Sequence, residues 1–123
     1  MPKRETVDAF VSQVMSGDHV GAIRDWYAED AWMQENQTPP RIGRALLMEH
    51  EAKALARAAR VDTELLAPAL IDGDRVVIRW RFKFVPKGLD AKPTSMEEVA
   101  WQSWIGDKIV AETFFYDPKQ IGR

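Results

Sequence analysis

The sequence contains no cysteine, which excludes disulfides, thiolate metal sites and a cysteine nucleophile. It also lacks any apolar run near the roughly 20 residues that a membrane-spanning helix needs. No apolar segment follows the first five residues, so we expect no secretory signal and a cytoplasmic location. The net charge of −2 lacks the basic excess of nucleic-acid-binding proteins. We therefore expect neither nucleic acid nor a membrane among the partners.

The abundant residues are those of a packed core. Of the 123 residues, 46% are hydrophobic and 29% are charged, which suits one globular domain over residues 1–123. Five Trp, five Phe and two Tyr supply enough aromatic side chains to build a core, line a cavity or cover an interface.

Helical patterns occupy most of the first half of the chain. Apolar residues from Val7 to Met15 recur at the spacing of one buried helix face. Asp18 is a suitable N-cap for a second, short helix whose apolar side includes Tyr27. Residues 31–35 are predicted as a short strand, and a run of good helix formers predicts a long helix over residues 43–60.

Strand patterns dominate the second half. The predicted strands cover residues 61–70, 75–85, 95–104 and 109–116, and Asp-Gly or Gly-Asp pairs mark tight turns. Apolar and charged side chains alternate most clearly over 75–85. The order predicts an α+β fold, in which a curved antiparallel sheet wraps around the N-terminal helices and leaves one central pocket.

Two segments and the aromatic C-terminal strands carry a resemblance to a known family. The segments are YAEDA, from Tyr27 to Ala31, and TPPRIGR, from Thr38 to Arg44. They resemble the SnoaL-like domains of the superfamily that includes ketosteroid isomerases, polyketide cyclases, limonene epoxide hydrolase and the nuclear transport factor. The resemblance covers the chain from Phe10 to Pro118 and implies the cone-shaped fold.

The resemblance also implies which residues carry chemistry. Glu35 stands where ketosteroid isomerases have a general-base carboxylate. Their oxyanion hole needs a Tyr and an Asp, but the matching positions hold Phe10 and Ala100, so steroid isomerisation is not expected. The epoxide hydrolases use an Asp-Arg-Asp set, and the segment Arg79-Trp80-Arg81 departs from it.

Strand alternation and the resemblance together place a set of side chains around the expected pocket. The candidate catalytic residues are Glu35, Glu112 and His50. The candidate ligand-binding residues are Gln102, Tyr116, Trp80, Phe82, Phe114, Tyr27 and Met33. No metal ligand is expected, because the two histidines lie far apart in the sequence.

Each polar candidate has a simpler explanation. Glu35 fits a solvated acid beside a turn, and His50 fits an ordinary helix-surface histidine that has no partner in the pocket. The alternative for His50 is an acid–base pair with Glu35 or Glu112. Gln102 and Glu112 fit a buried hydrogen-bond network that satisfies only itself. His19, at a helix start, is predicted to be solvated.

The outer face of the predicted sheet suggests a partner. Arg79, Arg81, Trp101 and Phe115 share that face, and an apolar patch with a charged rim is typical of an interface. We expect a homodimer through this face, as the resemblance also implies.

Two classes of function follow from these expectations. The first is a cofactor-independent isomerase or cyclase that moves a proton next to a carbonyl of a small apolar molecule, with Glu35 as the base. The second is a non-catalytic module that binds a hydrophobic ligand or serves as a dimeric interaction domain.

Overall fold

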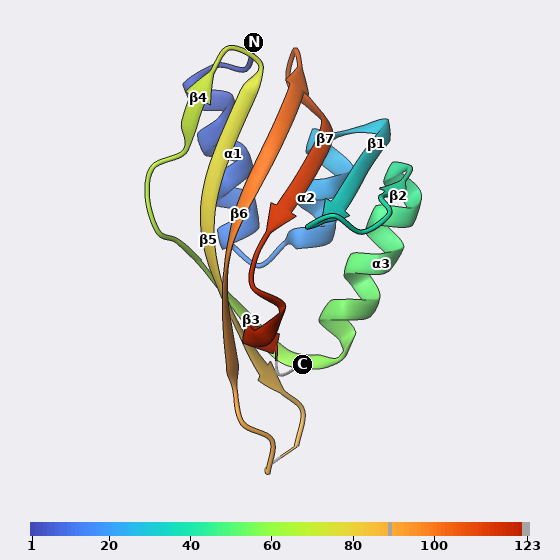
Figure 1. Ribbon diagram of the computed structural model, residues 1–123, viewed down its shortest axis with the longest axis vertical. Helices are drawn as coiled ribbons and strands as arrows, with labels where there is room; N and C mark the ends of the chain where they lie inside the picture. Colours follow the sequence, from blue (N-terminus) through green and yellow to red (C-terminus); the bar gives the residue numbers. More distant parts are fainter. Residues whose placement is uncertain (89, 122–123) are drawn as a thin grey trace.

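The computed structural model describes residues 1–88 and 90–121 (Figure 1). Within them the α-helices are α1 (Arg4–Met15), α2 (His19–Trp26) and α3 (Arg44–Ala56). The strands are β1 (Tyr27–Glu35), β2 (Arg41–Ile42), β3 (Ala58–Leu65), β4 (Leu70–Asp72), β5 (Arg75–Pro86), β6 (Thr94–Ile105) and β7 (Lys108–Phe115). A short 3₁₀ helix, η1 (Pro118–Ile121), follows them. The expected α+β class is confirmed.

The strands form one curved, open sheet in the order β2-β1-β7-β6-β5-β3, with β4 paired to β5. The expectation of a fully antiparallel sheet is wrong at one place, because β1 runs parallel to β7. No hairpin links these two strands, so their relative direction is set by the long path of the chain between them. Helix α3 contacts both β1 and β3, which lie toward opposite edges of the sheet, and thereby covers its concave side (Figure 1).

The predicted hairpins are confirmed. Tight turns at Gly73 and Gly106 join β4 to β5 and β6 to β7, and both glycines have a φ near +60°, which side chains other than glycine tolerate poorly. Alternation along β5 is as expected: Val76 and Ile78 are buried, whereas Arg79 is exposed.

Three predicted boundaries are wrong. Tyr27 is the first residue of β1 and does not belong to the second helix. Helix α3 ends at Ala56 instead of residue 60, because pairing with the end of β5 draws the chain from Ala58 onward into β3 despite its helix-forming residues. The strand predicted over 61–70 stops at Leu65, before Pro68, which cannot donate to a ladder.

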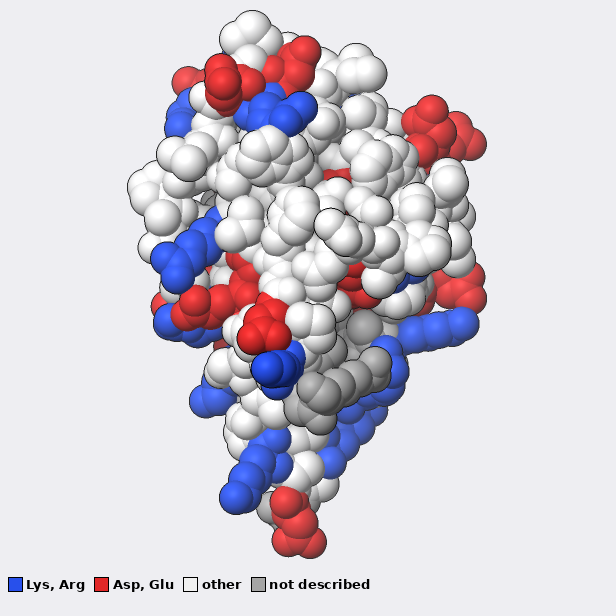
Figure 2. All heavy atoms as spheres, viewed as in Figure 1, with Lys and Arg blue, Asp and Glu red and all other residues white. Residues whose placement is uncertain are grey.

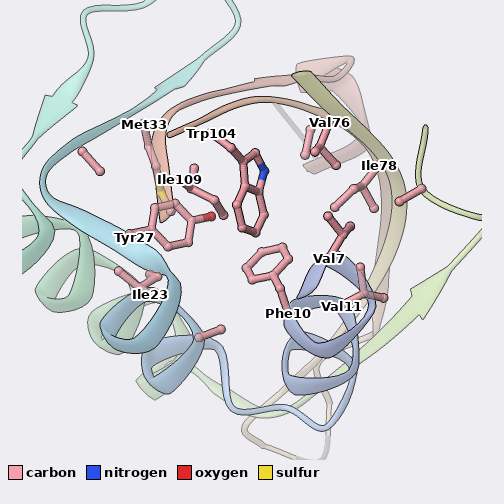
Figure 3. Packing of buried hydrophobic residues seen from close by; sticks show 14 of the residues in the cluster. Val7, Phe10, Val11, Ile23, Tyr27, Met33, Val76, Ile78, Trp104 and Ile109 are labelled. Atoms are coloured by element: carbon pink, nitrogen blue, oxygen red, sulfur yellow. The ribbon is translucent and has the colours of Figure 1, made fainter. Parts of the chain in front are cut away.

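The helices and the concave face of the sheet enclose the core. The ring of Phe10 on α1 meets the ring of Trp104 edge to face, at a centroid distance of 6.0 Å, and meets Tyr27 at 6.1 Å (Figure 3). Val7 and Ile78 are fully buried beside them. These contacts fix α1 and β1 against the wide end of the sheet, and thereby position the side chains of the cavity described next.

The charged side chains are unevenly spread over the face shown in Figure 2. Lys and Arg gather along the sides of the narrow end of the molecule, and the wider end has an uncharged centre with acidic and basic side chains along its edge. Both signs of charge are present on this face, which agrees with the small net charge of the chain.

Candidate functional site

A cavity of about 190 Å³ lies between the concave face of the sheet and the helices. Its lining comes from all three α-helices and from six of the strands, and it is mainly aromatic and aliphatic. The aromatic members include Phe10, Tyr27, Trp80, Phe82 and Phe114. Since a dry cavity of about 150 Å³ can hold benzene, this space suits a molecule with one small ring.

Polar side chains enter this lining from a row of paired residues that crosses the sheet. Gln102 on β6 is opposite Glu112 on β7, and Glu112 is opposite Met33 on β1. Gln102 is fully buried and Glu112 is 2% exposed. Strand alternation alone therefore brings a carboxyl group and an amide into the apolar interior.

The carboxyl group of Glu112 is the centre of a hydrogen-bonded chain. The indole Nε1 of Trp104 donates to Gln102 Oε1 at 2.9 Å, and Gln102 Nε2 donates to Glu112 Oε2 at 2.6 Å. The hydroxyl of Tyr27 donates to the other carboxyl oxygen, Oε1. Burial raises the pKa of Glu112 to about 7, although the hydrogen bonds from Gln102 and Tyr27 oppose the rise.

The geometry of this chain determines where a proton on Glu112 must reside. An indole N–H only donates, so Trp104 fixes the amide of Gln102 with its oxygen toward the indole and its NH₂ toward Glu112. Oε2 must therefore accept, and a proton can be held only on Oε1. When Glu112 is protonated, Oε1 donates to Tyr27, and the Tyr27 hydroxyl becomes free to donate elsewhere.

Glu98 is a second buried acid in the cavity wall. It lies on β6, is 8% exposed, and forms no hydrogen bond or ion pair with any residue that the structure describes. Burial, and then repulsion from Glu112, Glu35 and Glu51, raises the pKa of Glu98 to about 8. At neutral pH this side chain is therefore mainly the uncharged acid.

Glu35 ends β1 at the mouth of the cavity. Its Oε2 lies 3.5 Å from Nη1 of Arg41 on β2, and the two side chains are 39% and 24% exposed. Asn36, the residue after Glu35, takes a positive φ and its side chain accepts from the backbone N–H of Tyr116. The strand end that carries Glu35 is thus held to the end of β7.

The two histidines have different environments, and only that of His19 differs from the solvated one expected for it. His19 is buried: its Nε2 lies 2.9 Å from Thr63 Oγ1, and its Nδ1 lies 3.5 Å from Glu51 Oε1. The prediction that His19 is solvated is therefore wrong, because Glu51 of α3 and Thr63 of β3 contact its ring at the start of α2. His50 is exposed at the cavity rim and forms neither of the ion pairs with Glu35 or Glu112 that the sequence suggested.

Most of the candidate residues meet around this one space. Those that line it are Glu35, Glu112, His50, Tyr27, Met33, Trp80, Phe82 and Phe114. Gln102 lies behind Glu112 and not at the cavity surface. Tyr116 follows the end of β7 and is not a lining residue.

Four polar lining residues are absent from the candidate set: His19, Arg41, Glu51 and Glu98. For Glu98 a signal was present, since alternation on β6 places it on the same face as Gln102. For His19 and Glu51 no local pattern distinguishes them from surface residues, because their place in the cavity wall depends on contacts between α2, α3 and β3.

In the part of the chain that the structure describes, no group of three or more His, Asp or Glu side chains is arranged to hold a metal ion. Over the same residues, none of the helices combines the length and the apolar character needed to cross a membrane.

The SnoaL-like domain family matches residues 7–112, which is most of the chain and includes Glu35, Glu98 and Glu112. The protein belongs to the SnoaL-like domain family. The resemblance seen in the sequence is thereby confirmed. A comparison with curated proteins found no match.

Solved structures share the cone-shaped fold of ketosteroid isomerase and the nuclear transport factor. A protein from Mesorhizobium loti, described as a SnoaL-like polyketide cyclase, is 23% identical with a TM-score of 0.74, over 91% of this chain and 97% of that one. A protein with a ketosteroid isomerase-like fold from Catenulispora acidiphila, in complex with trimethylamine, is 19% identical with a TM-score of 0.78, over 95% and 88%. TerC, co-crystallised with polyporic acid, is 14% identical with a TM-score of 0.77, over 96% and 93%. At these identities the comparisons establish the fold of this SnoaL-like protein.

Proposed function

We propose that this SnoaL-like protein catalyses cofactor-independent proton transfer next to a carbonyl group of a small, largely apolar molecule, giving isomerisation or aldol-type cyclisation. One observation carries the proposal: the chain from Trp104 through Gln102 and Glu112 ends at the hydroxyl of Tyr27, in the wall of an aromatic cavity. This series of hydrogen bonds holds the Tyr27 hydroxyl in a fixed position. The hydroxyl can donate to a substrate only when Glu112 carries a proton.

The reaction uses two groups in different places. Glu35, at the cavity mouth, removes the proton from the carbon next to the carbonyl and returns it at the new position. Tyr27 donates a hydrogen bond to the carbonyl oxygen as negative charge develops there, when protonated Glu112 supports the hydroxyl from behind. His50 at the rim faces the same space and orients the outer part of the substrate.

Isomerisation of cyclohex-3-enone to its conjugated isomer is a suitable first probe, because the single ring suits a cavity of about 190 Å³. Ultraviolet absorbance of the conjugated product reports the rate. Glu35→Gln is expected to lower kcat by about 10²–10⁴-fold, the usual contribution of a positioned general base. Glu49→Gln, on the exposed side of α3, is the matched control and leaves the rate unchanged.

The pH profile tests the role of Tyr27 separately. The wild-type rate is expected to fall as the pH rises above about 7, because ionised Glu112 then holds the Tyr27 hydroxyl. Glu112→Gln keeps an N–H donor toward Tyr27 at every pH, so the fall should disappear. Unchanged turnover in Glu35→Gln, or the same alkaline fall in Glu112→Gln, contradicts the mechanism. If the wild-type protein binds apolar ketones without converting any of them, it is the non-catalytic ligand-binding module instead.

We also propose that two copies associate through the outer face of the sheet. Trp101 and Phe115 are 42% and 48% exposed on that face, which is unusual for such large aromatic side chains. Arg79 and Arg81 are both paired with Glu97, at 3.1 and 2.7 Å, so their charges are largely balanced within the chain. An apolar centre with a neutralised charged rim fits a contact between identical surfaces.

A further inference from the structure

Glu98 has no role in the proton transfer proposed above. Its side chain is 8% exposed, lines the cavity, and has no hydrogen-bonding or ionic partner within residues 1–88 and 90–121. Its carboxyl oxygens are not fully enclosed by protein atoms and open onto the cavity. The fold therefore presents to the ligand space an acidic group without a partner among the described residues.

Two aromatic residues of the neighbouring strand β5 lie on the same face of the sheet as this acid. Trp80 on β5 is the direct cross-strand partner of Glu98, and Phe82 follows on the same face. The two rings lie 5.9 Å apart between centroids, at an angle of 34°. Ring faces of this kind attract cations, most strongly when water is excluded.

Acids also outnumber bases in the cavity lining. Four carboxyl groups contribute to it, from Glu35, Glu51, Glu98 and Glu112, against the guanidinium of Arg41 and the imidazoles of His19 and His50. Arg41 lies beside Glu35 at the mouth. His19 is already held by Glu51 and Thr63, and His50 is exposed at the rim. No charged side chain of the lining thus neutralises Glu98 from within.

We propose that the cavity recognises an organic ammonium group, with the Glu98 carboxylate as its ionic partner and Trp80 and Phe82 as its aromatic wall. This rests on the proposed function, because it assigns a basic nitrogen to the substrate of the same site. The volume of about 190 Å³ admits an ammonium with small alkyl substituents or one ring. Binding of the cation ionises Glu98 and releases its proton to solvent.

The test compares two ligands of equal shape on the full chain. Choline carries a trimethylammonium group, and 3,3-dimethylbutan-1-ol replaces its nitrogen by carbon and has no charge. Isothermal titration at pH 8.5 should show choline binding at least tenfold more tightly than the alcohol. Equal affinity of the two ligands, or no choline binding at millimolar concentrations, overturns the proposal without any variant.

Variants then assign the preference to one residue. Glu98→Gln keeps the shape of the side chain and should abolish the preference for choline. Glu97→Gln is the matched control, because Glu97 is the preceding residue on β6 and its carboxylate pairs with Arg79 and Arg81 on the outer face. Retention of the preference in Glu98→Gln, or its loss in Glu97→Gln, contradicts the assignment.

The release of the Glu98 proton makes choline affinity depend on pH. A purely structural role of Glu98 would not produce this dependence. The pKa of Glu98 is about 8, so choline affinity should rise between pH 6 and pH 8, by up to about tenfold per pH unit, and level off above. A flat profile overturns the ionic pairing. Binding of choline with no turnover of any ketone would refute the proposed function and leave this inference standing. Turnover of neutral ketones with no preference for choline would support the proposed function and refute the inference that the cavity recognises an ammonium group.

Discussion

Replacing Glu98 by Gln should stabilise the protein at alkaline pH and leave it almost unchanged in acid. In the unfolded chain this carboxyl titrates near 4.5, whereas burial raises its pKa to about 8 in the fold. The folded state therefore holds a proton that the unfolded state loses between these two values. By linkage, the free energy of unfolding falls as the pH rises from about 4.5 to about 8.

The size of the effect follows from the same two values. One pKa unit corresponds to about 1.4 kcal/mol, so a rise from 4.5 to about 8 corresponds to roughly 5 kcal/mol at most. Water entry and local relaxation around an ionised Glu98 reduce this figure, and we expect a gain of about 2–4 kcal/mol in the variant at pH 9. Glu112, with its pKa near 7, contributes a similar slope over a narrower range.

Urea unfolding at half-unit steps between pH 5 and pH 9, followed by circular dichroism, measures this directly. Near pH 5 the variant and the wild type should agree within about 1 kcal/mol, since both side chains are then neutral. Thermal unfolding should show a rise in Tm of about 3–5 °C per kcal/mol at the alkaline end. Glu97→Gln serves as the control, because Arg81 and Arg79 lower the pKa of Glu97, so its removal cannot stabilise the protein at high pH.

Two results would refute the reasoning. The first is a wild-type stability that stays constant or rises from pH 5 to pH 8, since that would mean Glu98 ionises as freely in the fold as in the unfolded chain. The second is a Glu98→Gln variant in which the free energy of unfolding still falls with pH as it does in the wild type. That result would mean that a group other than Glu98 binds the proton.

Three further outcomes can be checked on the same purified protein. Leu47→Ala should lower the free energy of unfolding by about 2–5 kcal/mol in urea titrations, because Leu47 is 1% exposed and is the buried residue of α3. Asp18→Ala should cost about 1 kcal/mol in the same assay, since its side chain accepts from the backbone N–H of Gly21 at 3.1 Å and caps α2; Asp18→Asn should recover most of the loss. Trp101→Glu should convert a dimer to a monomer in analytical ultracentrifugation without lowering Tm markedly, and an unchanged sedimentation coefficient would exclude the outer face as the interface.

The strands and turns in the second half of the chain could be predicted because they depend on short sequence patterns. Alternation along β5 depends only on the pleat, and the glycine turns at Gly73 and Gly106 depend only on backbone freedom. The end of α3 and the start of β3 were misjudged for the opposite reason. There, pairing with β5 overrides the helix preference of Ala58 and its neighbours, and that pairing joins residues far apart in the chain.

The candidate site likewise has features that could be predicted from the sequence and features that could not. Alternation and the family resemblance brought Glu35, Glu112 and Gln102 to one face, but they did not distinguish a solvated acid from a buried one. The unlike environments of Glu35 and Glu98 depend on which neighbours approach: Arg41 lies beside the first, and no described residue pairs with the second. His19 illustrates the same limit, because its burial requires contacts with Thr63 and Glu51 from two other elements.

The order of residues is therefore sufficient for most of the elements, although not for all of their ends, and for the inward-facing sides of the strands and the family, since each depends on chemistry within a few neighbours along the chain. The parallel pairing of β1 with β7, the proton chain from Trp104 to Tyr27 and the unpaired state of Glu98 arise only when distant segments meet. Desolvation and hydrogen bonding act through space, and they set the charge of a carboxyl group only once the fold has enclosed it.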